Sequence, residues 1–386
     1  MTTRTHAARA VFFLNGLTLS TFIVRQPSLK LSHHLTDGQL GMLGMCFAVA
    51  ALVAMQSTGP LVAAFGVRVL RTSLVVMPVL LSLVGLARGP VQLALATTAL
   101  GAVHGATDAA MNAYAVGVER TVKRPILSGC HAAWSISAVL ASLLTAVLAG
   151  AGIGLAVHLP VGAAILLAGG LAVGSLMPPM QHATATARAH RARWRDGWTR
   201  TAIVLGLTGT ALMVCEGAAL GWGGVFLHDS KGASLGLAAI TVTAYTAGQT
   251  GGRLVGDRLA MRYDPGSLFR TGGLVAAGGL TAAVLAPHPA AAVAGFAIMG
   301  LGTSVLLPLT FSAVGQAGSG AGSTAALVSR FTTFTYAGIL LGPAAIGWAA
   351  QSTSLTWTLA SLVPVMSVIA LVTRLHPQRR HNPAAA

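Results

Sequence analysis

Long apolar runs separated by short polar segments dominate the chain. A run of about 20 mostly apolar residues is long enough to cross a bilayer as a helix, so the pattern predicts twelve membrane-spanning helices. The first six lie at 8–27, 40–64, 70–87, 91–118, 127–149 and 154–177, and the second six at 200–226, 234–256, 267–286, 290–314, 321–348 and 355–373. We therefore predict an all-α integral membrane fold.

One long polar stretch, 178–198, separates the sixth span from the seventh. It predicts four parts: an N-terminal six-helix bundle over 1–178, a basic cytoplasmic linker over 179–199, a C-terminal six-helix bundle over 200–375 and a cytoplasmic tail over 376–386. Segments rich in glycine and arginine recur in the two halves, at 59–68 and at 252–258, and we expect each to form a short cytoplasmic turn. Such internal repeats are typical of secondary transporters, which bind their substrate between the repeats.

Composition and charge support a membrane protein. Of the 386 residues, 54% are hydrophobic and only 8% are charged, whereas about a quarter of the residues of a soluble domain are charged. The net charge of +16 comes from small basic clusters between apolar segments, which is the pattern of cytoplasmic loops. It predicts a multi-pass protein of the bacterial cytoplasmic membrane with both termini inside the cell. No zinc-finger spacing or aromatic-interleaved basic block indicates nucleic-acid binding.

The motifs of enzymes and of metal or cofactor sites are missing from the sequence. Cys46, Cys130 and Cys215 lie far apart in apolar segments, without metal-ligand or redox spacing. No P-loop, G-x-S-x-G, HExxH or dinucleotide-binding fingerprint occurs. We therefore predict no enzymatic activity, no metal and no cofactor.

Asp108 is the chemically most informative residue, because it lies in the middle of the apolar span 91–118. A charge at membrane depth is usually kept when it faces a cavity, a partner or a transported ion. His104, Asp108 and Asn112 are spaced by four residues, so they share one helix face. Gly101 and Gly105 lie on or beside that face and predict that a neighbouring helix approaches closely there. We expect Asp108 to carry a proton or to accept a hydrogen bond from a substrate.

Glu216 is a second carboxylate in an apolar span, and we expect it to load and release a proton. The alternative is a hydrogen-bonded residue in helix packing. Arg25, at the outer end of the first span, and Arg330, in the eleventh, are candidates for binding an anionic or polyhydroxylated substrate. Each arginine is also a candidate counter-ion of Asp108 or Glu216. In that alternative the ion pair between acid and arginine has a purely structural role. For Arg25 a further alternative is extension of its head group to the membrane interface.

Several uncharged polar side chains complete the candidate substrate cavity. Sugar sites are often built from such groups, but ordinary hydrogen bonds between helices use them too. The residues are Tyr245, Gln249, Thr332 and Tyr336, on the eighth and eleventh spans.

Two segments resemble the gating turns of the major facilitator superfamily. The pattern Gly59-x-Leu-x-x-x-x-Gly66-x-Arg68 is similar to the motif that joins the second and third helices of that family, with Ala63 at its acidic position. The second-half version, 252–259, retains the acid. The resemblance implies a gating role for Gly59, Gly66, Arg68, Gly252, Arg253, Asp257 and Arg258.

A third segment resembles the fucose-permease-like branch and related bacterial inner-membrane proteins. Asp108, Asn112 and Tyr114 are similar to an acid, Asn, Tyr pattern in the fourth helix of sugar permeases, with Ala113 in place of a proline. There the acid is a glutamate implicated in proton coupling and sugar binding, so the resemblance implies this role for Asp108.

Together, the residues and the resemblance predict a transporter that moves a small solute, with a sugar or similar polar metabolite favoured. We expect it to be proton-coupled and to function as a monomer. Two alternatives stay open: a proton-antiport exporter of a drug or secondary metabolite, and a membrane receptor or scaffold that does not transport. Ala63 favours the scaffold slightly, whereas the two intramembrane acids oppose it.

Overall fold

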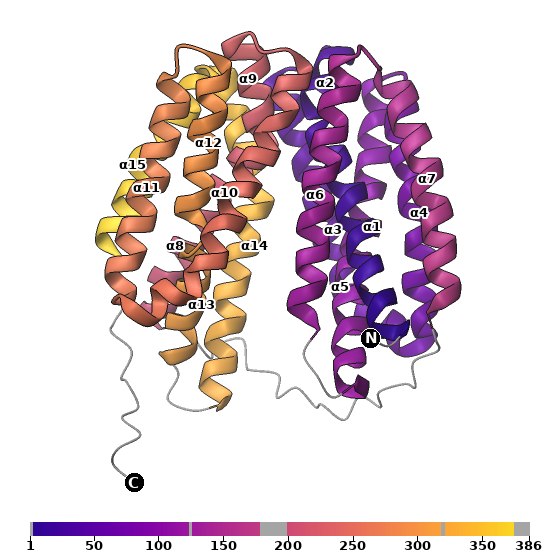
Figure 1. The fold of residues 1–386 in the computed structure, drawn as a ribbon, viewed down its shortest axis with the longest axis horizontal. Helices are drawn as coiled ribbons and strands as arrows, with labels where there is room; N and C mark the ends of the chain where they lie inside the picture. The colour runs from indigo at the N-terminus through magenta and orange to yellow at the C-terminus, as the bar shows by residue number, and fades with distance from the viewer. Residues whose placement is uncertain (1–2, 123–125, 178–198, 318–320, 374–386) are drawn as a thin grey trace. The chain divides into compact units, whose positions relative to one another are not determined.

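A computed structural model describes residues 3–122, 126–177, 199–317 and 321–373. Within these ranges all regular secondary structure is helical, which confirms the predicted all-α class. Figure 1 shows the helices in chain order.

Seven helices form the first half of the chain. They are α1 (Thr3–Val24), α2 (Gln26–Ser32), α3 (Asp37–Phe65), α4 (Val67–Leu86), α5 (Pro90–Val122), α6 (Leu127–Gly150) and α7 (Leu155–Leu176). Six of them coincide with the predicted spans. The additional short helix α2 follows a break at Arg25 and has a proline, Pro27, in its first turn, where proline is well tolerated.

The second half contains eight α-helices and one π-helical turn. They are α8 (Arg200–Gly217), η1 (Ala218–Trp222), α9 (Gly223–Lys231), α10 (Leu235–Arg262), α11 (Pro265–Leu285), α12 (Pro289–Thr303), α13 (Leu306–Gln316), α14 (Ala321–Ser352) and α15 (Leu355–Val372). Two of the predicted spans are interrupted. The π-helical turn η1 divides the seventh span, and a break at Ser304 and Val305 divides the tenth.

The helices have the length and the surface of membrane spans. In the described ranges, ten helical segments are long and apolar enough to cross a membrane. Helices α5 and α10, with 33 and 28 residues, are also long enough but contain more polar residues. Large apolar side chains point outward along the helices; Leu95, Ile165 and Leu254 are 68%, 68% and 76% exposed. Such a surface suits hydrocarbon rather than water.

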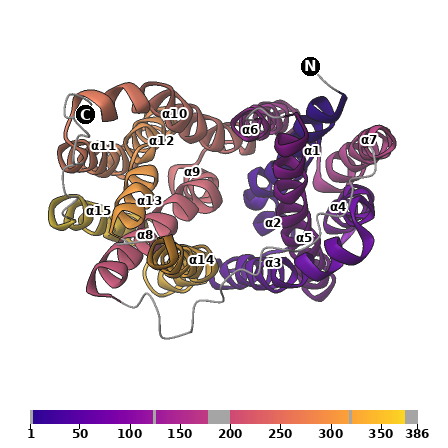
Figure 2. The same ribbon diagram turned by 90° about the horizontal axis from the view of Figure 1, so that it is seen from below.

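The folded chain divides into two compact units. Unit 1 comprises 1–189, 220–243 and 343–355, and unit 2 comprises 190–219, 244–342 and 356–386. Unit 1 therefore contains segments from the second half of the chain. In it, α9 packs against α2, the first residues of α10 pack against α6, and the last residues of α14 pack against α3 (Figures 1 and 2). The predicted boundary between two six-helix bundles, at the segment 179–199, stays a prediction.

The two glycine- and arginine-rich segments differ from each other in local structure. Gly66 separates α3 from α4 with φ of 58°, a conformation that favours glycine, so the chain turns there as predicted. The predicted turn at 252–258 is wrong, because this segment is helical and lies inside α10. A Cβ atom at Gly252 would overlap Ser304, so this glycine serves helix packing. The chain turns instead at Asp264, whose Oδ2 accepts a hydrogen bond from Ser267 N at 2.9 Å and caps α11.

Candidate functional site

Asp108 lies half-buried on α5, with one helical turn between it and each of its polar neighbours His104 and Asn112. Asn112 Nδ2 donates a hydrogen bond to the backbone oxygen of Asp108 at 2.9 Å. Among the described residues, the Asp108 carboxylate itself has no hydrogen bond and no ion pair. The predicted polar face is therefore present, and its carboxylate is uncommitted.

Close packing of α3 on α5 builds the surroundings of this face. Cβ atoms at Gly101 and Gly105 would overlap the backbone carbonyls of Phe47 and Ala51, so the two helices touch backbone to backbone, as the two glycines predicted. This approach places the Phe47 ring on the His104 ring, with centroids 5.6 Å apart and 28° between the planes.

Asn15 and Trp134 join this cluster, although neither residue was predicted to belong to the site. Asn15 on α1 is 1% exposed. Trp134 Nε1 on α6 donates to Asn15 Oδ1 at 3.1 Å, and Asn15 Nδ2 lies 3.4 Å from His104 Nδ1. The available signal was the single asparagine inside the first span, because an amide at membrane depth needs polar partners.

Arg25 is placed differently from the expectation. It is 1% exposed, and its Nε donates to His158 Nδ1 at 2.9 Å, its Nη1 to Ser28 Oγ at 3.3 Å and its Nη2 to Ile153 O at 2.8 Å. These partners are uncharged, so Arg25 is not the counter-ion of an intramembrane acid in this structure. It lies at the break between α1 and α2 and satisfies polar groups near the ends of neighbouring helices; a role in binding substrate stays a prediction.

Glu216 has its own polar neighbours in unit 2. It lies half-buried at the end of α8, immediately before η1, and π-helical turns are frequent at functional sites. Gln249 and Arg253, both on α10, are its electrostatic neighbours. Tyr245 on the same helix bonds through its hydroxyl to Thr303 Oγ1 at 2.9 Å. The structure thus brings together four of the predicted residues, which are Glu216, Tyr245, Gln249 and Arg253.

The remaining predicted residues lie elsewhere on α10 and α14 or outside the described residues. Arg330, 7% exposed, and the half-buried Tyr336 are on α14. Arg258, near the end of α10, is exposed; the side chain of Asp257 and the surroundings of Gly59, in unit 1, lie outside what the structure describes. The predicted basic linker, 179–199, lies almost entirely outside the described residues, and the predicted tail, 376–386, lies wholly outside them.

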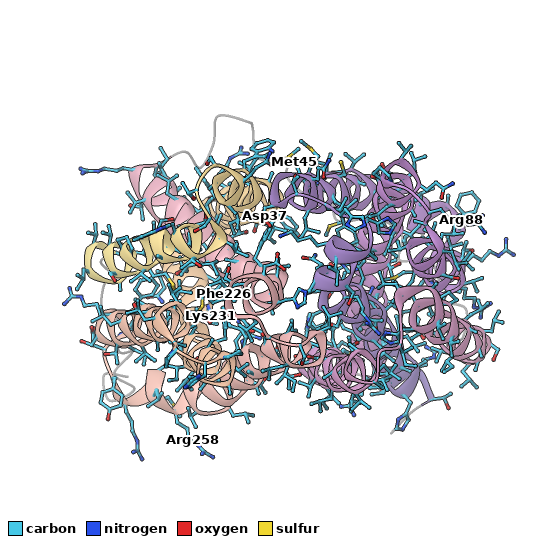
Figure 3. The ribbon with its side chains drawn as sticks, turned by 90° about the horizontal axis from the view of Figure 1, so that it is seen from above. Asp37, Met45, Arg88, Phe226, Lys231 and Arg258 are labelled. Atoms are coloured by element: carbon cyan, nitrogen blue, oxygen red, sulfur yellow. The ribbon has the colours of Figure 1, made fainter. Side chains whose placement is uncertain are left out.

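An ion cluster at one end of unit 1 was not predicted. Lys30 on α2 pairs with Asp229 on α9, and its Nζ lies 2.6 Å from Asp37 Oδ1 at the start of α3. Burial lowers the pKa of Lys30, but hydrogen bonds and attraction from Asp229 and Asp37 outweigh it and raise that pKa above its ordinary value. Lys231 Nζ lies 5.4 Å from the Phe226 ring centroid on the same α9 (Figure 3). Lys30 is therefore a stable cation that joins three helices.

Backbone contacts through small residues accompany this ion cluster. A Cβ at Gly41 would lie 2.6 Å from Pro343 O, where α3 meets α14, and a Cβ at Gly236 would lie 2.8 Å from Ala146 O, where α10 meets α6. Ser142 Oγ on α6 donates to Ala239 O on α10 at 2.6 Å, inside the protein. We call these contacts, with those of Lys30, the closing contacts. Between the described residues, no group of three or more His, Cys, Asp or Glu side chains is placed to hold a metal ion.

Known proteins resemble the chain over nearly its full length. It is 32% identical over 358 residues to an uncharacterised transporter of Sinorhizobium fredii, covering 90% of this chain and 91% of the relative. It is 30% identical over 370 residues to an uncharacterised MFS-type transporter of Yersinia pestis, covering 95% and 94%. The membrane protein MosC of Rhizobium meliloti is 28% identical over 362 residues, which are 93% of this chain and 86% of MosC. No protein-family model matches the chain.

Solved structures with low sequence identity share the fold. The nucleoside transporter NupG superposes with a TM-score of 0.78 at 14% identity, covering 96% of this chain and 98% of NupG. A bacterial homologue of the human lysosomal transporter Spinster gives 0.75 at 17% identity, with 96% and 95% covered. A D-xylose–proton symporter gives 0.70 at 14% identity, with 97% and 98% covered.

Proposed function

The chain belongs to the major facilitator superfamily of membrane transporters, and on this premise we propose that it is a proton-coupled carrier of a small, sugar-like polar solute. The observation that carries the proposal is the Asp108 carboxylate, half-buried in a membrane helix and without a partner among the described residues. A carboxylate at membrane depth is energetically costly, so it is usually kept only where it has a function. A purely structural acid would be paired.

Coupling follows from the charge of Asp108. As an anion the side chain opposes closure of an apolar gate over it, because a desolvated charge is unfavourable. Protonation removes the charge and lets the loaded carrier change its conformation. Glu216, with Gln249 and Arg253 beside it, is the second proton-binding candidate. Import and export of the solute would use these same residues, so they do not distinguish the two directions of transport.

The proposed orientation places both termini in the cytoplasm. Two helices begin with pairs of arginines: α1 with Arg4 and Arg9, and α4 with Arg68 and Arg71. We assign these basic helix starts to the cytoplasmic side. An excess of Lys and Arg marks cytoplasmic segments. The Lys30 cluster, after α1, is then at the outer end.

The closing contacts fit an alternating-access carrier in which the outer passage is shut. They join first-half helices of unit 1 to segments of α9, α10 and α14. In the proposed cycle these contacts break when the outer passage opens and form again when it closes. The chain is expected to complete this cycle as a monomer.

A sugar-like solute is supported by the site's chemistry and by the names of structural neighbours. The face of α5 offers a carboxylate, an imidazole and an amide, which pair with hydroxyl groups. Two of the neighbouring structures are of a nucleoside transporter and of a D-xylose–proton symporter. Pentoses, hexoses and nucleosides are therefore the first solutes to test.

The test is solute-dependent proton movement in proteoliposomes that contain a pH-sensitive dye. The proposal predicts that a sugar or nucleoside added outside makes protons enter with it, which acidifies the lumen. Proton release from the lumen on addition of an amphipathic cation would instead establish the exporter. No proton movement with any solute, while radiolabelled solute still exchanges, would overturn proton coupling. Neither movement nor exchange across the panel would favour the receptor or scaffold.

A further inference from the structure

The Asn15 amide is saturated by hydrogen-bonding groups from three other helices of unit 1. Trp134 Nε1 on α6 donates to Asn15 Oδ1 at 3.1 Å. Asn15 Nδ2 lies 3.8 Å from Met77 Sδ on α4 and 3.4 Å from His104 Nδ1 on α5. Asn15 is 1% exposed and Met77 2%, so water does not compete for these groups. One acceptor and two donor hydrogens thus meet three partners.

The chemistry of two partners determines which end of the amide is which. An indole N–H only donates and a thioether sulfur only accepts. The amide oxygen must therefore face Trp134 and the amide nitrogen must face Met77. If the amide were flipped, a donor would face a donor and an acceptor would face an acceptor, away from water, where unmade hydrogen bonds are costly.

This orientation in turn determines the tautomer of His104. Since Asn15 Nδ2 points a hydrogen at His104 Nδ1, that nitrogen must accept, and the single ring proton of the neutral imidazole sits on Nε2. No partner for His104 Nε2 is seen among the described residues, and the side chain is only half-buried. The Phe47 ring stacked on the imidazole limits its rotation.

Small residues make the cluster possible. A Cβ atom at Gly16 would lie 2.9 Å from Trp134 Cδ1, so only glycine lets α6 bring the indole to Asn15. On the other side, Gly101 lets α3 bring Phe47 against His104. The sequence thus supplies the packing around the hydrogen-bond chain as well as its members.

We propose that Trp134 and Asn15 are positioning residues that hold His104 as the neutral Nε2–H tautomer, ready to donate a hydrogen bond to an uncharged oxygen of the solute. Asp108, four residues along the same helix face, provides an acceptor about 6 Å away. A donor and an acceptor at this spacing fit two hydroxyl groups of one sugar ring. The solute class rests on the proposed transport function, whereas the tautomer does not.

The test is NMR of the protein in lipid bilayers with 15N-labelled histidine. Protonated and unprotonated ring nitrogens have well-separated shifts, and the His104 signals are those lost in His104→Gln. The proposal predicts an unprotonated Nδ1 and a protonated Nε2 in the wild type. Trp134→Phe keeps an aromatic ring but loses the N–H, so only the weaker contact with Met77 opposes a flip of the amide, and the second tautomer appears. Trp348→Phe, at a residue 52% exposed on the surface, is the matched control and leaves the spectrum unchanged.

A second variant protects the test against misfolding. Asn15→Asp keeps the shape but offers only acceptors, so it moves the ring proton of His104 to Nδ1 or gives the doubly protonated ring. A wild-type His104 protonated on Nδ1 overturns the proposal, as does a Trp134→Phe spectrum identical to that of the wild type in a protein that elutes as a single species.

Transport measurements then separate this inference from the proposed function. For a carried sugar, Trp134→Phe raises KM by about tenfold, the value of one hydrogen bond, with a smaller effect on kcat. A solute analogue that lacks the recognised hydroxyl loses this dependence. If no solute is carried while the tautomers behave as predicted, the transport proposal fails and the positioning role stands. If sugar is carried but Trp134→Phe changes neither KM nor the tautomer, the positioning role fails alone.

Discussion

Substitution of Lys30 by glutamine is predicted to open the closing contacts. The ammonium pairs with Asp37 and Asp229, and the three side chains are between 16% and 31% exposed. Partly exposed ion pairs are worth up to about 1 kcal/mol each, so loss of both costs at most about 2 kcal/mol. At 1.4 kcal/mol per factor of ten, the fraction of molecules with open contacts rises by as much as about 30-fold.

A cysteine inside the closing contacts measures this fraction. Ser142 is completely buried where α6 meets α10, and Ser142→Cys in a background without Cys46, Cys130 and Cys215 places one thiol there. When opening is rare and fast, the rate of alkylation by a membrane-impermeant maleimide is proportional to the open fraction. Lys30→Gln should then label several times and up to about 30 times faster.

Two controls make the result specific to the ion pairs. Lys30→Arg keeps the charge and should label at nearly the wild-type rate. Arg88 is an exposed cation at the edge of unit 1 with no ion pair to the described chain (Figure 3), so Arg88→Gln should have no effect. The reasoning is refuted if Lys30→Gln labels within about twofold of the wild type, since the ion pairs would then contribute almost nothing.

Three further predictions concern helix packing, the closing contacts and the link between Glu119 and α6. Gly105→Leu drives a side chain into the backbone of Ala51 and should lower the melting temperature in detergent, whereas an unchanged melting temperature would contradict the observed packing. Ser142→Ala removes the hydrogen bond to Ala239 O and should destabilise the closing contacts by about 1 kcal/mol, seen as faster proteolysis of the loops beside them. Glu119 accepts two backbone N–H groups at the start of α6, which lower its pKa below the ordinary 4.5. The Glu119 carboxylate therefore stabilises the folded state fully above its ordinary pKa, and this stabilisation is lost as the pH falls through the lowered pKa. Glu119→Gln should remove this part of the pH dependence of the free energy of unfolding.

The positions of the helices could be predicted from the sequence because the bilayer requires long apolar runs. All twelve predicted spans correspond to helices or to interrupted helices. A close helix contact on this face of α5 was also predictable from Gly101 and Gly105, but the identity of the partner helix, α3, was not. The error at 252–258 has a local cause. Glycines that serve helix packing and glycines that form turns look alike in a sequence, and of the two segments only the first, at Gly66, has a positive φ.

Partners of polar groups could not be predicted in the same way. Trp134 is 119 residues from Asn15, and Asp229 is 199 residues from Lys30; hydropathy places each residue at a depth but does not say which helices are neighbours. Arg25 shows the same limit. The position of Arg25 at the end of the first span was predicted. That it bonds to His158 and a backbone carbonyl, and not to an acid, depends on the break after α1. The role of Asp108 rests on the carboxylate's lack of a partner, which only a structure can reveal.

The most direct test of the central claim compares wild-type protein with Asp108→Asn in proteoliposomes, for a solute that the wild type accumulates under a pH gradient. Two rates are measured: exchange of labelled for unlabelled solute without a gradient, and accumulation driven by the gradient. The account predicts that Asp108→Asn, which imitates the protonated side chain, still exchanges solute but no longer accumulates it. Accumulation by Asp108→Asn at the wild-type rate would contradict proton coupling through this residue.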